Sequence, residues 1–293
     1  MTARLRGIPE RLHVSGATRV VGLLGYPVRH SRSPEMHNAA FAALGLDFCY
    51  VPFAVPPDAL KAAVRGLAAL GVVGANVTIP HKERVIPYVD ELSSEARLIG
   101  AVNTIHHHRG RLIGYNTDAS GFLRAFREDT GVAVRGGRFL VLGAGGAARA
   151  VVAALALGGA RGVTVANRSV PKARRLVARF RRAFAHLDWS AVALSGELPS
   201  CRSFRGVIQA TSVGMAPGDP SPLPAAWLGG SVAVYDLVYG APTALLRAAR
   251  ARGVPHAGGL GMLVHQGALA FTIWTGRRAP VDVMRAALLG ACP

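Results

Sequence analysis

Only three of the 34 basic residues in this sequence are lysines, and one of them, Lys82, ends the string NVTIPHK at 76–82. Arginine keeps its proton at any working pH, whereas lysine can release it. A lysine retained among arginines, close to polar Asn76 and Thr78, therefore indicates proton transfer. A surface lysine without a chemical role is the alternative that this residue alone leaves open.

A second residue suited to proton chemistry is Asp118, in the string YNTDASG at 115–121. It joins Asn76, Thr78 and Asn103 in a set of short hydrogen-bonding side chains. Such a set, with a lysine and an aspartate, suits a polyhydroxylated substrate. The alternative for Asp118 is a plain N-cap of the helix that follows it.

The string HSRSP at 30–34 places two serines one residue apart at an expected helix start. Ser31 and Ser33 can offer two hydroxyls, together with main-chain N–H groups, to a carboxylate. A plain N-cap would explain Ser33 but would leave Ser31 without a role.

The string GAGGAA at 143–148 lies between an apolar segment and a helical one, where a dinucleotide fingerprint belongs. Gly143 would allow the tight turn, Gly145 would let a pyrophosphate approach the backbone, and Ala148 takes the place of the third glycine. The helix that follows presents free N–H groups to phosphate. A purely structural turn is the alternative.

The residues after the next strand distinguish NADP from NAD. NAD-binding proteins usually carry Asp or Glu there, about 20 residues further on, to hold the ribose 2′-hydroxyl. Here Asn167, Arg168 and Ser169 follow the strand, and Lys172 comes next, so no carboxylate is present. Arg168 and Lys172 can hold a 2′-phosphate by charge-assisted hydrogen bonds, which favours NADP.

The alternation of strand-like and helix-like segments predicts an α/β fold. Strands are expected over 19–25, 47–53, 71–78, 102–107, 161–167, 205–211 and 231–239, and a strand followed by a helix within 139–159. Helices are expected over 33–45, with Ser33 as N-cap, and over 57–71, 82–92, 93–100, 118–129, 171–182, 241–253, 261–276 and 280–290. A hairpin turn is expected at 108–111 and a linker at 131–138.

The composition, 51% hydrophobic and 17% charged, is that of a chain with a packed core. Cys49, Cys201 and Cys292 are far apart, so neither a disulfide framework nor a structural zinc site is expected, and a reducing cytoplasm fits. We expect no signal peptide at the N-terminus and no membrane segment, since no apolar stretch approaches roughly 20 residues.

Taken together, these motifs show that the sequence resembles the shikimate dehydrogenase family, from about residue 19 to residue 290. The resemblance is carried, in the family's order, by HSRSP, GANVTIPHKE, GAVNT, GYNTDASG, GAGGAARA, ANRS, ATSVGM, VYDLVYGAPT and GLGMLVHQGA. Several of these strings are rare, so the joint match is far more specific than the glycine loop alone.

The resemblance implies a two-domain enzyme that reduces 3-dehydroshikimate reversibly to shikimate with NADPH, in chorismate and aromatic amino acid biosynthesis. An N-terminal α/β substrate-binding and catalytic domain is expected over 1–120, completed by C-terminal helices at 260–293. A Rossmann-like NADP-binding domain is expected over 121–259, with a deep cleft between the two. A monomer or homodimer is expected.

The resemblance also implies roles for individual residues. Lys82 and Asp118 match the catalytic acid–base pair. The substrate-binding positions are matched by Ser31, Ser33, Thr78, Asn103, Asp118, Tyr239 and Gln266. The cofactor-binding positions are matched by Gly143, Ala144, Gly145, Gly146, Ala147, Asn167, Arg168, Ser169, Lys172, Leu237 and Gly259.

Two departures from the family pattern bear on the site. Asp118 is followed by Ala119 where the family often has glycine, and Gly258 stands where the family often has aspartate. Neither change touches the expected acid–base pair. The nearest rival is a quinate/shikimate dehydrogenase that uses NAD, but such relatives tend to carry an acidic residue after the Asn-Arg pair, where this chain has Ser169.

The net charge of +18 leaves a basic nucleic-acid-binding protein as a rival from another class. The most basic segment, 171–182, is expected to be a solvated helix face, and the sequence has no recognition-helix or zinc pattern. His106, His107 and His108 alternate faces on an expected strand, so no metal site is expected there.

Overall fold

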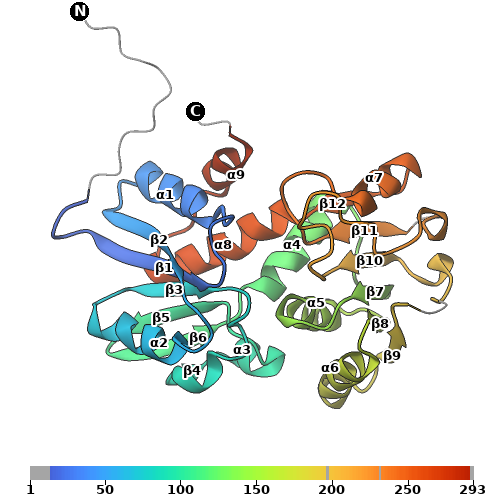
Figure 1. Ribbon diagram of the computed structural model, residues 1–293, viewed down its shortest axis with the longest axis horizontal. Coiled ribbons are helices and arrows are strands. Elements are labelled where there is room, and N and C mark those ends of the chain that lie inside the picture. The colour runs from blue at the N-terminus through green and yellow to red at the C-terminus, as the bar shows by residue number, and fades with distance from the viewer. Residues whose placement is uncertain (1–13, 196–197, 231, 291–293) are drawn as a thin grey trace, which may run out of the picture. The chain divides into compact units, whose positions relative to one another are not determined.

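The computed structural model describes residues 14–195, 198–230 and 232–290, which form two compact units (Figure 1). Among these residues, the first unit comprises 14–96, 102–115 and 267–290, and the second comprises 97–101 and 116–266. Cys292, the N-terminal segment considered for a signal peptide, and Ser231 at the start of an expected strand lie outside the described residues.

A mixed six-stranded sheet in the order β2-β1-β3-β5-β6-β4 is the centre of the first unit. Its strands are β1 Arg19–Gly25, β2 Phe48–Ala54, β3 Gly74–Val77, β4 Glu91–Leu92, β5 Thr104–His108 and β6 Arg111–Tyr115. β1, β2 and β3 are parallel, whereas β5 runs antiparallel to β3 and to β6. The carboxyl end of β3 and the amino end of β5 therefore lie at the same edge.

Helices cover both faces of this sheet (Figure 1). They are α1 Ser33–Ala43, α2 Leu60–Ala69, α3 Ser94–Ile99, α8 Leu260–Thr275 and α9 Val281–Leu289. The last residues of α3 and the first residues of α8 belong to the second unit. Leu60, Val64 and Leu67 of α2 pack on Ala75 and Val77 of β3. Aromatic rings of α1, β2 and α8 form a separate cluster, and α9 packs on α1.

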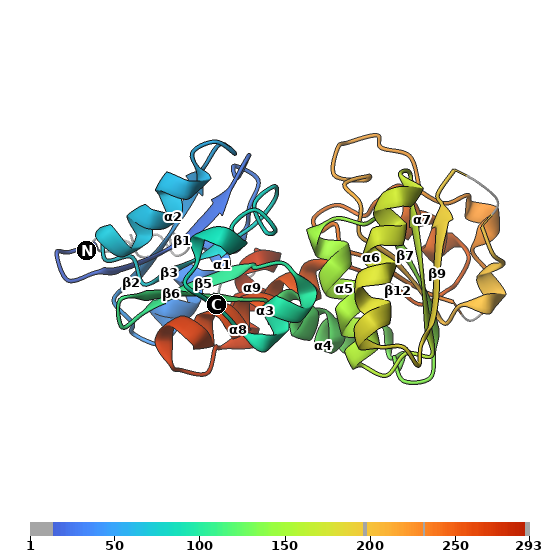
Figure 2. The same cartoon turned by 90° about the horizontal axis from the view of Figure 1, so that it is seen from below.

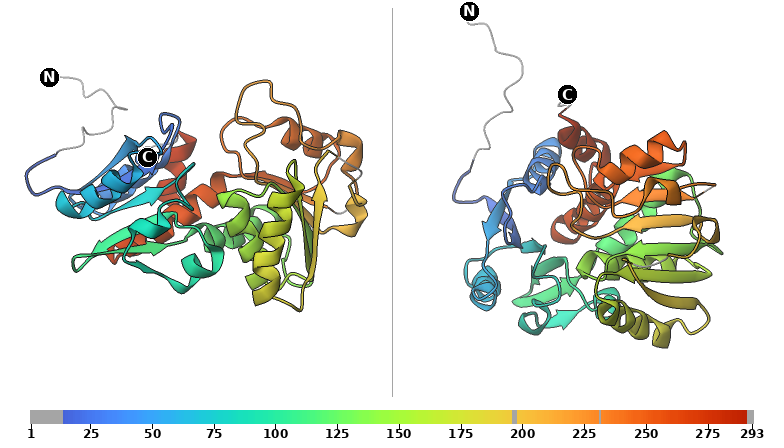
Figure 3. Two further views of the ribbon diagram at one scale, coloured as in Figure 1. Left: turned by 60° about the horizontal axis from the view of Figure 1, so that its bottom comes forward. Right: turned by 45° about the vertical axis from the view of Figure 1, so that its right-hand side comes forward.

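All six strands of the second sheet are parallel, in the order β12-β11-β10-β7-β8-β9 (Figure 3, right). They are β7 Arg138–Leu142, β8 Gly162–Asn167, β9 Asp188–Ala193, β10 Gly206–Gln209, β11 Ala233–Asp236 and β12 His256–Gly258. Counted from β7, this is the strand order of the dinucleotide-binding fold, and its order reverses between β7 and β10.

Alternate side chains of β7 bury against helices on opposite faces of this sheet. Phe139 and Val141 pack with α4 Asp118–Thr130, α5 Gly146–Leu157 and α6 Val170–Ala183, whereas Leu140 and Leu142 pack with α7 Ala244–Ala251. Figure 2 shows α5 and α6 side by side on one face. Burial on both faces is what makes these strands continuous apolar runs.

The predicted helix over 82–92 is wrong. The segment contains a turn, a short 3₁₀ helix at Ile86–Tyr88, and β4, which pairs with β6. Pro87 has no N–H to donate and would clash with the preceding turn of an α-helix. The strands β9 and β12 were not predicted, and both lie at the edges of the sheet.

Ser33 is not the N-cap of α1. The helix begins at Ser33, the N-cap residue is Arg32, and no side chain caps this end. The hairpin turn at 108–111 is confirmed, because His108 pairs with Arg111. None of the described helices is long and apolar enough to cross a lipid bilayer.

Candidate active site

One edge of the first sheet carries Thr78 and Asn103, two of the predicted substrate-binding residues. Thr78 directly follows β3, and Asn103 directly precedes β5. The register pairs Asn76 with Thr104, so the two strands meet at this edge. Gly25, at the end of β1, leads from the same edge into the segment that carries the paired serines.

Lys82 lies in a turn that a buried histidine anchors. The imidazole of His81 is fully buried, and its Nε2 lies 2.7 Å from the carbonyl oxygen of Val55. A carbonyl can only accept, so Nε2 carries the proton. The main chain adds two bonds, from the His81 N–H to the Thr78 carbonyl at 2.8 Å and from the Val85 N–H to the His81 carbonyl at 2.9 Å. These contacts hold the turn on which Lys82, itself partly buried, is mounted.

Thr78 is held against a glycine. Its N–H donates to the Leu24 carbonyl at 2.9 Å, and the Tyr26 N–H donates to the Ile79 carbonyl at 3.0 Å. A Cβ added to Gly25 would lie 2.3 Å from Cγ2 of Thr78, which is closer than real side chains approach. Only glycine lets the two segments come this close.

The paired serines lie together at the start of α1. The Ser33 N–H donates to Oγ of Ser31 at 3.3 Å, and the Ser31 N–H donates to the Val28 carbonyl at 3.0 Å. Ser33 is buried and Ser31 is partly exposed. Between them, Arg32 forms an ion pair with Glu35 at 2.6 Å on the surface. The helix N-terminus and two neighbouring hydroxyls thus form a donor-rich site suited to a carboxylate.

Asn76 is held inside the first unit by its own hydrogen bonds. It is buried, and its side-chain amide makes three hydrogen bonds inside the unit, to Tyr50, to the Asn103 carbonyl and to Thr104. Its bonding capacity is largely used within the fold, so it supports Asn103.

In the second unit, Asp118 is the first residue of α4 and is 3% exposed. Its N–H donates to Oδ1 of Asn116 at 3.1 Å, and Nδ2 of Asn116 donates to the Ala101 carbonyl at 2.9 Å. One turn along α4, a Cβ added to Gly121 would lie 2.7 Å from the main-chain nitrogen of Gln266. The turn of α4 that begins at Asp118 therefore packs directly against Gln266.

The glycine loop has the geometry that a dinucleotide requires. Gly143 follows β7 with a φ of +112°, and a Cβ there would meet the Ala210 carbonyl oxygen at 2.8 Å. Gly145 is the N-cap residue of α5, and no side chain caps this helix end. A Cβ added to Gly145 would meet no atom within 4 Å. The N–H groups at the start of α5 thus border open space at the carboxyl edge of the sheet. Ala148, which takes the place of the third glycine, lies in the first turn of α5 and is fully buried.

The end of β8 offers positive charge and no carboxylate. Arg168 and Lys172 are both exposed, and the first turn of α6 contains no acidic residue. Nδ2 of Asn167 donates to the Ser169 carbonyl at 3.0 Å, which fixes the turn between β8 and α6. This donor set fits a phosphate better than it fits a ribose hydroxyl.

The loop after β11 is organised by a buried carboxylate. Asp236 is fully buried and accepts from the Val238 N–H at 3.0 Å and from Oγ1 of Thr243 at 2.7 Å. Burial raises the pKa of Asp236 to about 6, against the smaller opposing effect of these two hydrogen bonds. The carboxylate thereby connects the end of β11 to the start of α7.

Leu237 and Gly259 lie in contact at this carboxyl edge. The Gly259 N–H donates to the Val238 carbonyl at 3.0 Å, and a Cβ on Gly259 would lie 2.1 Å from the Leu237 carbonyl oxygen. Tyr239 follows in the same loop and is partly buried. With the glycine loop and the end of β8, all the predicted cofactor-binding residues lie at the carboxyl ends of parallel strands, where such sheets bind ligands.

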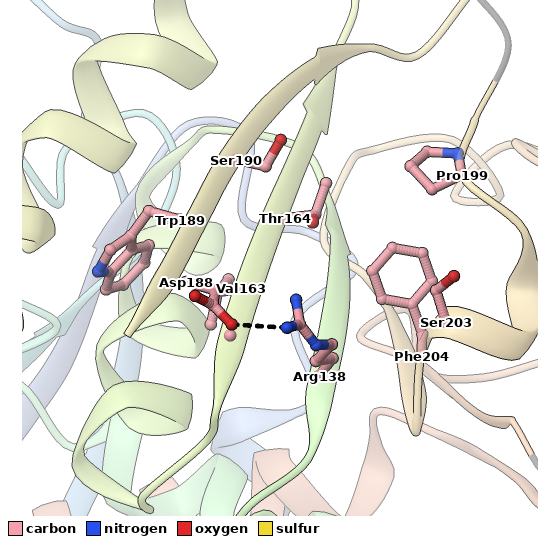
Figure 4. A pocket seen from close by; sticks show the side chains of 10 residues that line it. Arg138, Val163, Thr164, Asp188, Trp189, Ser190, Pro199, Ser203 and Phe204 are labelled. Carbon is pink, nitrogen blue, oxygen red and sulfur yellow. Dashed lines mark hydrogen bonds and ion pairs between the residues drawn. The ribbon is translucent and has the colours of Figure 1, made fainter. Parts of the chain in front are cut away.

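A separate hollow of about 280 Å³ lies at the opposite edge of the second sheet (Figure 4). It is lined by the first residues of β7, β8 and β9, and Arg138 forms an ion pair across it with Asp188 at 2.7 Å. Because this is the amino edge, the hollow is distinct from the predicted cofactor site. Its two charged groups neutralise each other.

The three consecutive histidines lie on β5. The rings of His106 and His108 are 5.3 Å apart. Burial, then the nearby positive charge of His108 and Arg19, lowers the pKa of His106. Within 14–195, 198–230 and 232–290, no three His, Cys, Asp or Glu side chains are grouped so that they could hold a metal ion.

Sequence reasoning missed His81, Tyr50 and Thr104, although each is adjacent to or bonded to a predicted site residue. The sequence contains a feature that points to two of them, His81 and Tyr50. His81 directly precedes Lys82, and Tyr50 places a hydroxyl inside the apolar strand FCYVPF. Local pattern does not reveal which polar group such a residue contacts.

Comparison with known proteins gives matches along most of the chain. Residues 23–105 match the shikimate dehydrogenase substrate binding domain, residues 127–194 match the shikimate/quinate 5-dehydrogenase family, and residues 259–289 match the shikimate 5′-dehydrogenase C-terminal domain. The NADP(+) shikimate dehydrogenase of Geobacter sulfurreducens is 50% identical over 280 residues, covering 94% of this chain and 98% of that protein.

Two solved structures extend the likeness to the fold. A shikimate dehydrogenase in complex with NADP+ has 40% identity and a TM-score of 0.88, covering 94% of this chain and 96% of its own. The Thermus thermophilus shikimate 5-dehydrogenase in complex with NADP(H) and shikimate has 40% identity and a TM-score of 0.83, covering 94% of this chain and 100% of its own.

Proposed function

Because this chain belongs to the shikimate dehydrogenase family and is an NADP-dependent oxidoreductase that acts on a CH–OH group, we propose that Lys82 and Asp118 are the acid–base pair with which it interconverts 3-dehydroshikimate and shikimate. The observation that carries this proposal is the sheet edge of the first unit. There Thr78, Asn103 and the turn of Lys82 lie together, and the segment that follows β1 carries the neighbouring hydroxyls of Ser31 and Ser33.

The chemistry of the substrate fits this edge. Shikimate has one carboxylate and several ring hydroxyls, which call for a donor-rich helix start and for short polar side chains. We assign the carboxylate to Ser31 and Ser33 and the hydroxyls to Thr78, Asn103 and Asp118. Tyr239 and Gln266 complete the set as groups that frame the ring. In this assignment Ser31, Ser33, Thr78 and Asn103 belong to the first unit, and all the cofactor-binding residues belong to the second.

NADPH, when bound, supplies the hydride. The residues at the carboxyl edge of the second sheet would hold it. The pyrophosphate would lie on the glycine loop, at Gly143, Ala144, Gly145, Gly146 and Ala147. The 2′-phosphate would be bound by Asn167, Arg168, Ser169 and Lys172, and the rest of the cofactor would lie beside Leu237 and Gly259. The open space above Gly145 and the positive φ of Gly143 support this fit.

The protein's own contribution to the reaction is a proton. As carbonyl reduction places negative charge on the substrate oxygen, the Lys82 ammonium donates a proton to that oxygen and stabilises the charge before transfer. In the oxidative direction the neutral amine takes the proton back. In this proposal Asp118 orients the lysine and the substrate hydroxyls.

The protein acts on a small molecule. From the family and the cysteine pattern we propose that it is a monomer or homodimer and that it is located in the cytoplasm.

The test is the rise of nicotinamide absorbance with purified protein, using shikimate or quinate with NADP⁺ or NAD⁺. We expect fast turnover only with shikimate and NADP⁺. Turnover of quinate with NAD⁺ would indicate an NAD-dependent quinate/shikimate dehydrogenase instead and would contradict the role given to Arg168. Absence of turnover in all four mixtures, from folded protein, would defeat the proposal.

A further inference from the structure

The positive charge of the protein is concentrated in the part of the second unit that carries the glycine loop. The chain contains 16 acidic residues, but none of them lies between Asp129 and Asp188, a segment that holds ten arginines and one lysine. This segment comprises β7, the glycine loop, α5, β8 and α6. Its excess of positive charge, eleven of the net +18, therefore has no carboxylate within the same segment to offset it.

The two edges of the second sheet differ in how this charge is balanced. At the amino edge, Nη2 of Arg138 and Nε of Arg161 lie 2.7 Å and 3.9 Å from Oδ2 of Asp188, which offsets part of their charge. At the carboxyl edge, Arg168 follows β8 and α6 begins, and α6 contains no acidic residue. The unbalanced charge therefore lies at the carboxyl edge and along α6, next to the proposed cofactor site.

Four basic residues of α6 recur at spacings of three and four, so their side chains share one face of the helix. They are Lys172, Arg175, Arg179 and Arg182, and all four are exposed. Arg174 is exposed beside Arg175, and neither of these two arginines forms an ion pair with a residue that the structure describes. Both lie within about 5 Å of Lys172 along the helix axis, since the rise is about 1.5 Å per residue.

We propose that Arg174 and Arg175 form a steering surface for NADP(H), which raises the rate at which the cofactor reaches Arg168 and Lys172. The proposal rests on the cofactor site given above. The pyrophosphate and the 2′-phosphate make this cofactor an anion, and exposed charges of one sign beside a site attract such a ligand before it makes contact. Because NAD(H) lacks the 2′-phosphate, the surface attracts it less strongly and so favours NADP(H) in the encounter.

The test measures the association and dissociation rate constants of NADPH by stopped-flow fluorescence, in the wild type and in the double variant Arg174→Gln/Arg175→Gln. Loss of a charge beside a site changes the association rate constant and its salt dependence more than it changes dissociation. At an ionic strength of about 20 mM we expect association to slow about three- to tenfold, and at about 300 mM less than about twofold. The dissociation rate constant should stay within about 1.5-fold of the wild-type value.

The matched control is Arg181→Gln/Arg182→Gln, in the last turn of the same helix. It makes the same change in net charge, but its arginines lie seven residues further on, about 10 Å along the axis, which is about one Debye length at 0.1 M salt. At that salt concentration it should slow NADPH association less than about 1.5-fold. Arg181 also donates to the Trp189 carbonyl at 3.0 Å, so thermal unfolding of both double variants checks that the fold is retained.

The same measurements with NADH complete the test, and the Arg174→Gln/Arg175→Gln change should slow NADH association less than it slows NADPH association. The proposal is wrong if this folded variant associates with NADPH at the wild-type rate in low salt, if it changes dissociation instead, or if the two double variants are slowed equally at 0.1 M salt. A wild type that binds NADPH with the expected rates but does not oxidise shikimate would defeat only the proposed function. A wild type that does not bind NADPH would overturn both.

Discussion

The main-chain N–H of Val102 donates to the carbonyl of Lys82 at 2.7 Å. This bond ties the turn of the proposed proton donor to the residue directly before Asn103. With His81 anchored on Val55, it holds the turn from two sides without using the Lys82 side chain. The ammonium group is thus carried by a fixed backbone, as a proton donor requires.

Replacement of Lys82 by Ala should lower kcat by about 10²- to 10⁴-fold with a small change in the KM for shikimate, because the proton donor acts in the transition state. Lys82→Arg should remain strongly impaired, since arginine keeps the charge but cannot release the proton. Lys61→Ala, which removes an exposed lysine of α2, is the control. Steady-state kinetics at saturating NADP⁺ measure all three, and a near-normal kcat in Lys82→Ala would exclude this residue from proton transfer.

Replacement of Gly25 by Ala should raise the KM for shikimate about tenfold. The added methyl would lie 2.3 Å from Cγ2 of Thr78 and 3.0 Å from Cγ1 of Val28, so Thr78 must move. Such overpacking typically costs about 1–3 kcal/mol of stability as well. Gly66→Ala on α2 is the matched control, because its methyl would meet nothing within 4 Å. Equal KM values for the two variants would separate Thr78 from substrate binding.

The sequence predicts features of this protein whose cause is local. The positive φ of Gly143 follows from a glycine between an apolar strand and a helix, and the α/β alternation follows from the spacing of apolar runs. Long-range contacts decide the rest. The residues Val85, Tyr88 and Leu92 have helical spacing, yet Glu91 and Leu92 pair with β6, and Pro87 interrupts the helix.

In the candidate site, too, some features have a local cause in the sequence and others depend on long-range contacts. Lys82 and the paired serines are recognisable from their neighbours in the sequence. In contrast, the roles of His81 and Tyr50 depend on partners 26 positions away in both cases, Val55 and Asn76. A sequence pattern cannot supply such a pairing, because it arises only when β2, β3 and the turn after β3 are packed together.

Replacement of Arg168 by Ala should raise the KM for NADP⁺ about 10- to 100-fold and leave the KM for NAD⁺ within about twofold. The reason is that a hydrogen bond to a charged group contributes roughly 1.5–3 kcal/mol, and only NADP⁺ has the 2′-phosphate. Arg250→Ala, an exposed arginine of α7, makes the same change in net charge and is the control. Equal losses for both cofactors would contradict the role of Arg168 at the 2′-phosphate.

His37 should make the folded protein sensitive to acid. Its ring is fully buried, is stacked on Tyr50 with centroids 4.6 Å apart, and has no hydrogen-bond partner for either nitrogen among the described residues. Burial lowers its pKa from 6.5 to about 3. The unfolded chain therefore binds a proton that the folded chain does not, and stability should fall as pH decreases from about 6.5 towards 3, by up to about 1.4 kcal/mol per pH unit.

The check on His37 is urea unfolding from pH 7 to pH 4.5 in the wild type and in His37→Phe. Phenylalanine keeps a planar ring in the aromatic cluster and cannot be protonated, so the stability of this variant should decline less steeply with acid. His30→Phe, at an exposed position, should keep the wild-type slope. Identical slopes in all three proteins would show that His37 is not the group responsible.

Asp236 should have the opposite pH dependence. Its pKa in the folded protein is raised from 3.8 to about 6, so the folded chain holds the proton more tightly than the unfolded chain. The contribution of Asp236 to the free energy of unfolding is therefore fully present below about pH 4. It is lost as pH rises through 6, by up to about 1.4 kcal/mol per pH unit. In the wild type this gain on acidification partly offsets the loss due to His37, so the overall curve does not reveal either group.

Comparison of wild type with Asp236→Asn isolates the contribution of this carboxyl group. The amide can still accept from the Val238 N–H and can donate to Oγ1 of Thr243, which keeps the loop after β11 in place. The variant should gain stability relative to the wild type as pH rises from 4 to 6.5, because it has no charge to bury. Asp58→Asn, at an exposed site, should show a constant difference. If the Asp236→Asn difference is also constant over this range, the carboxyl group does not titrate there, and the loop that carries Leu237 and Tyr239 is independent of its protonation.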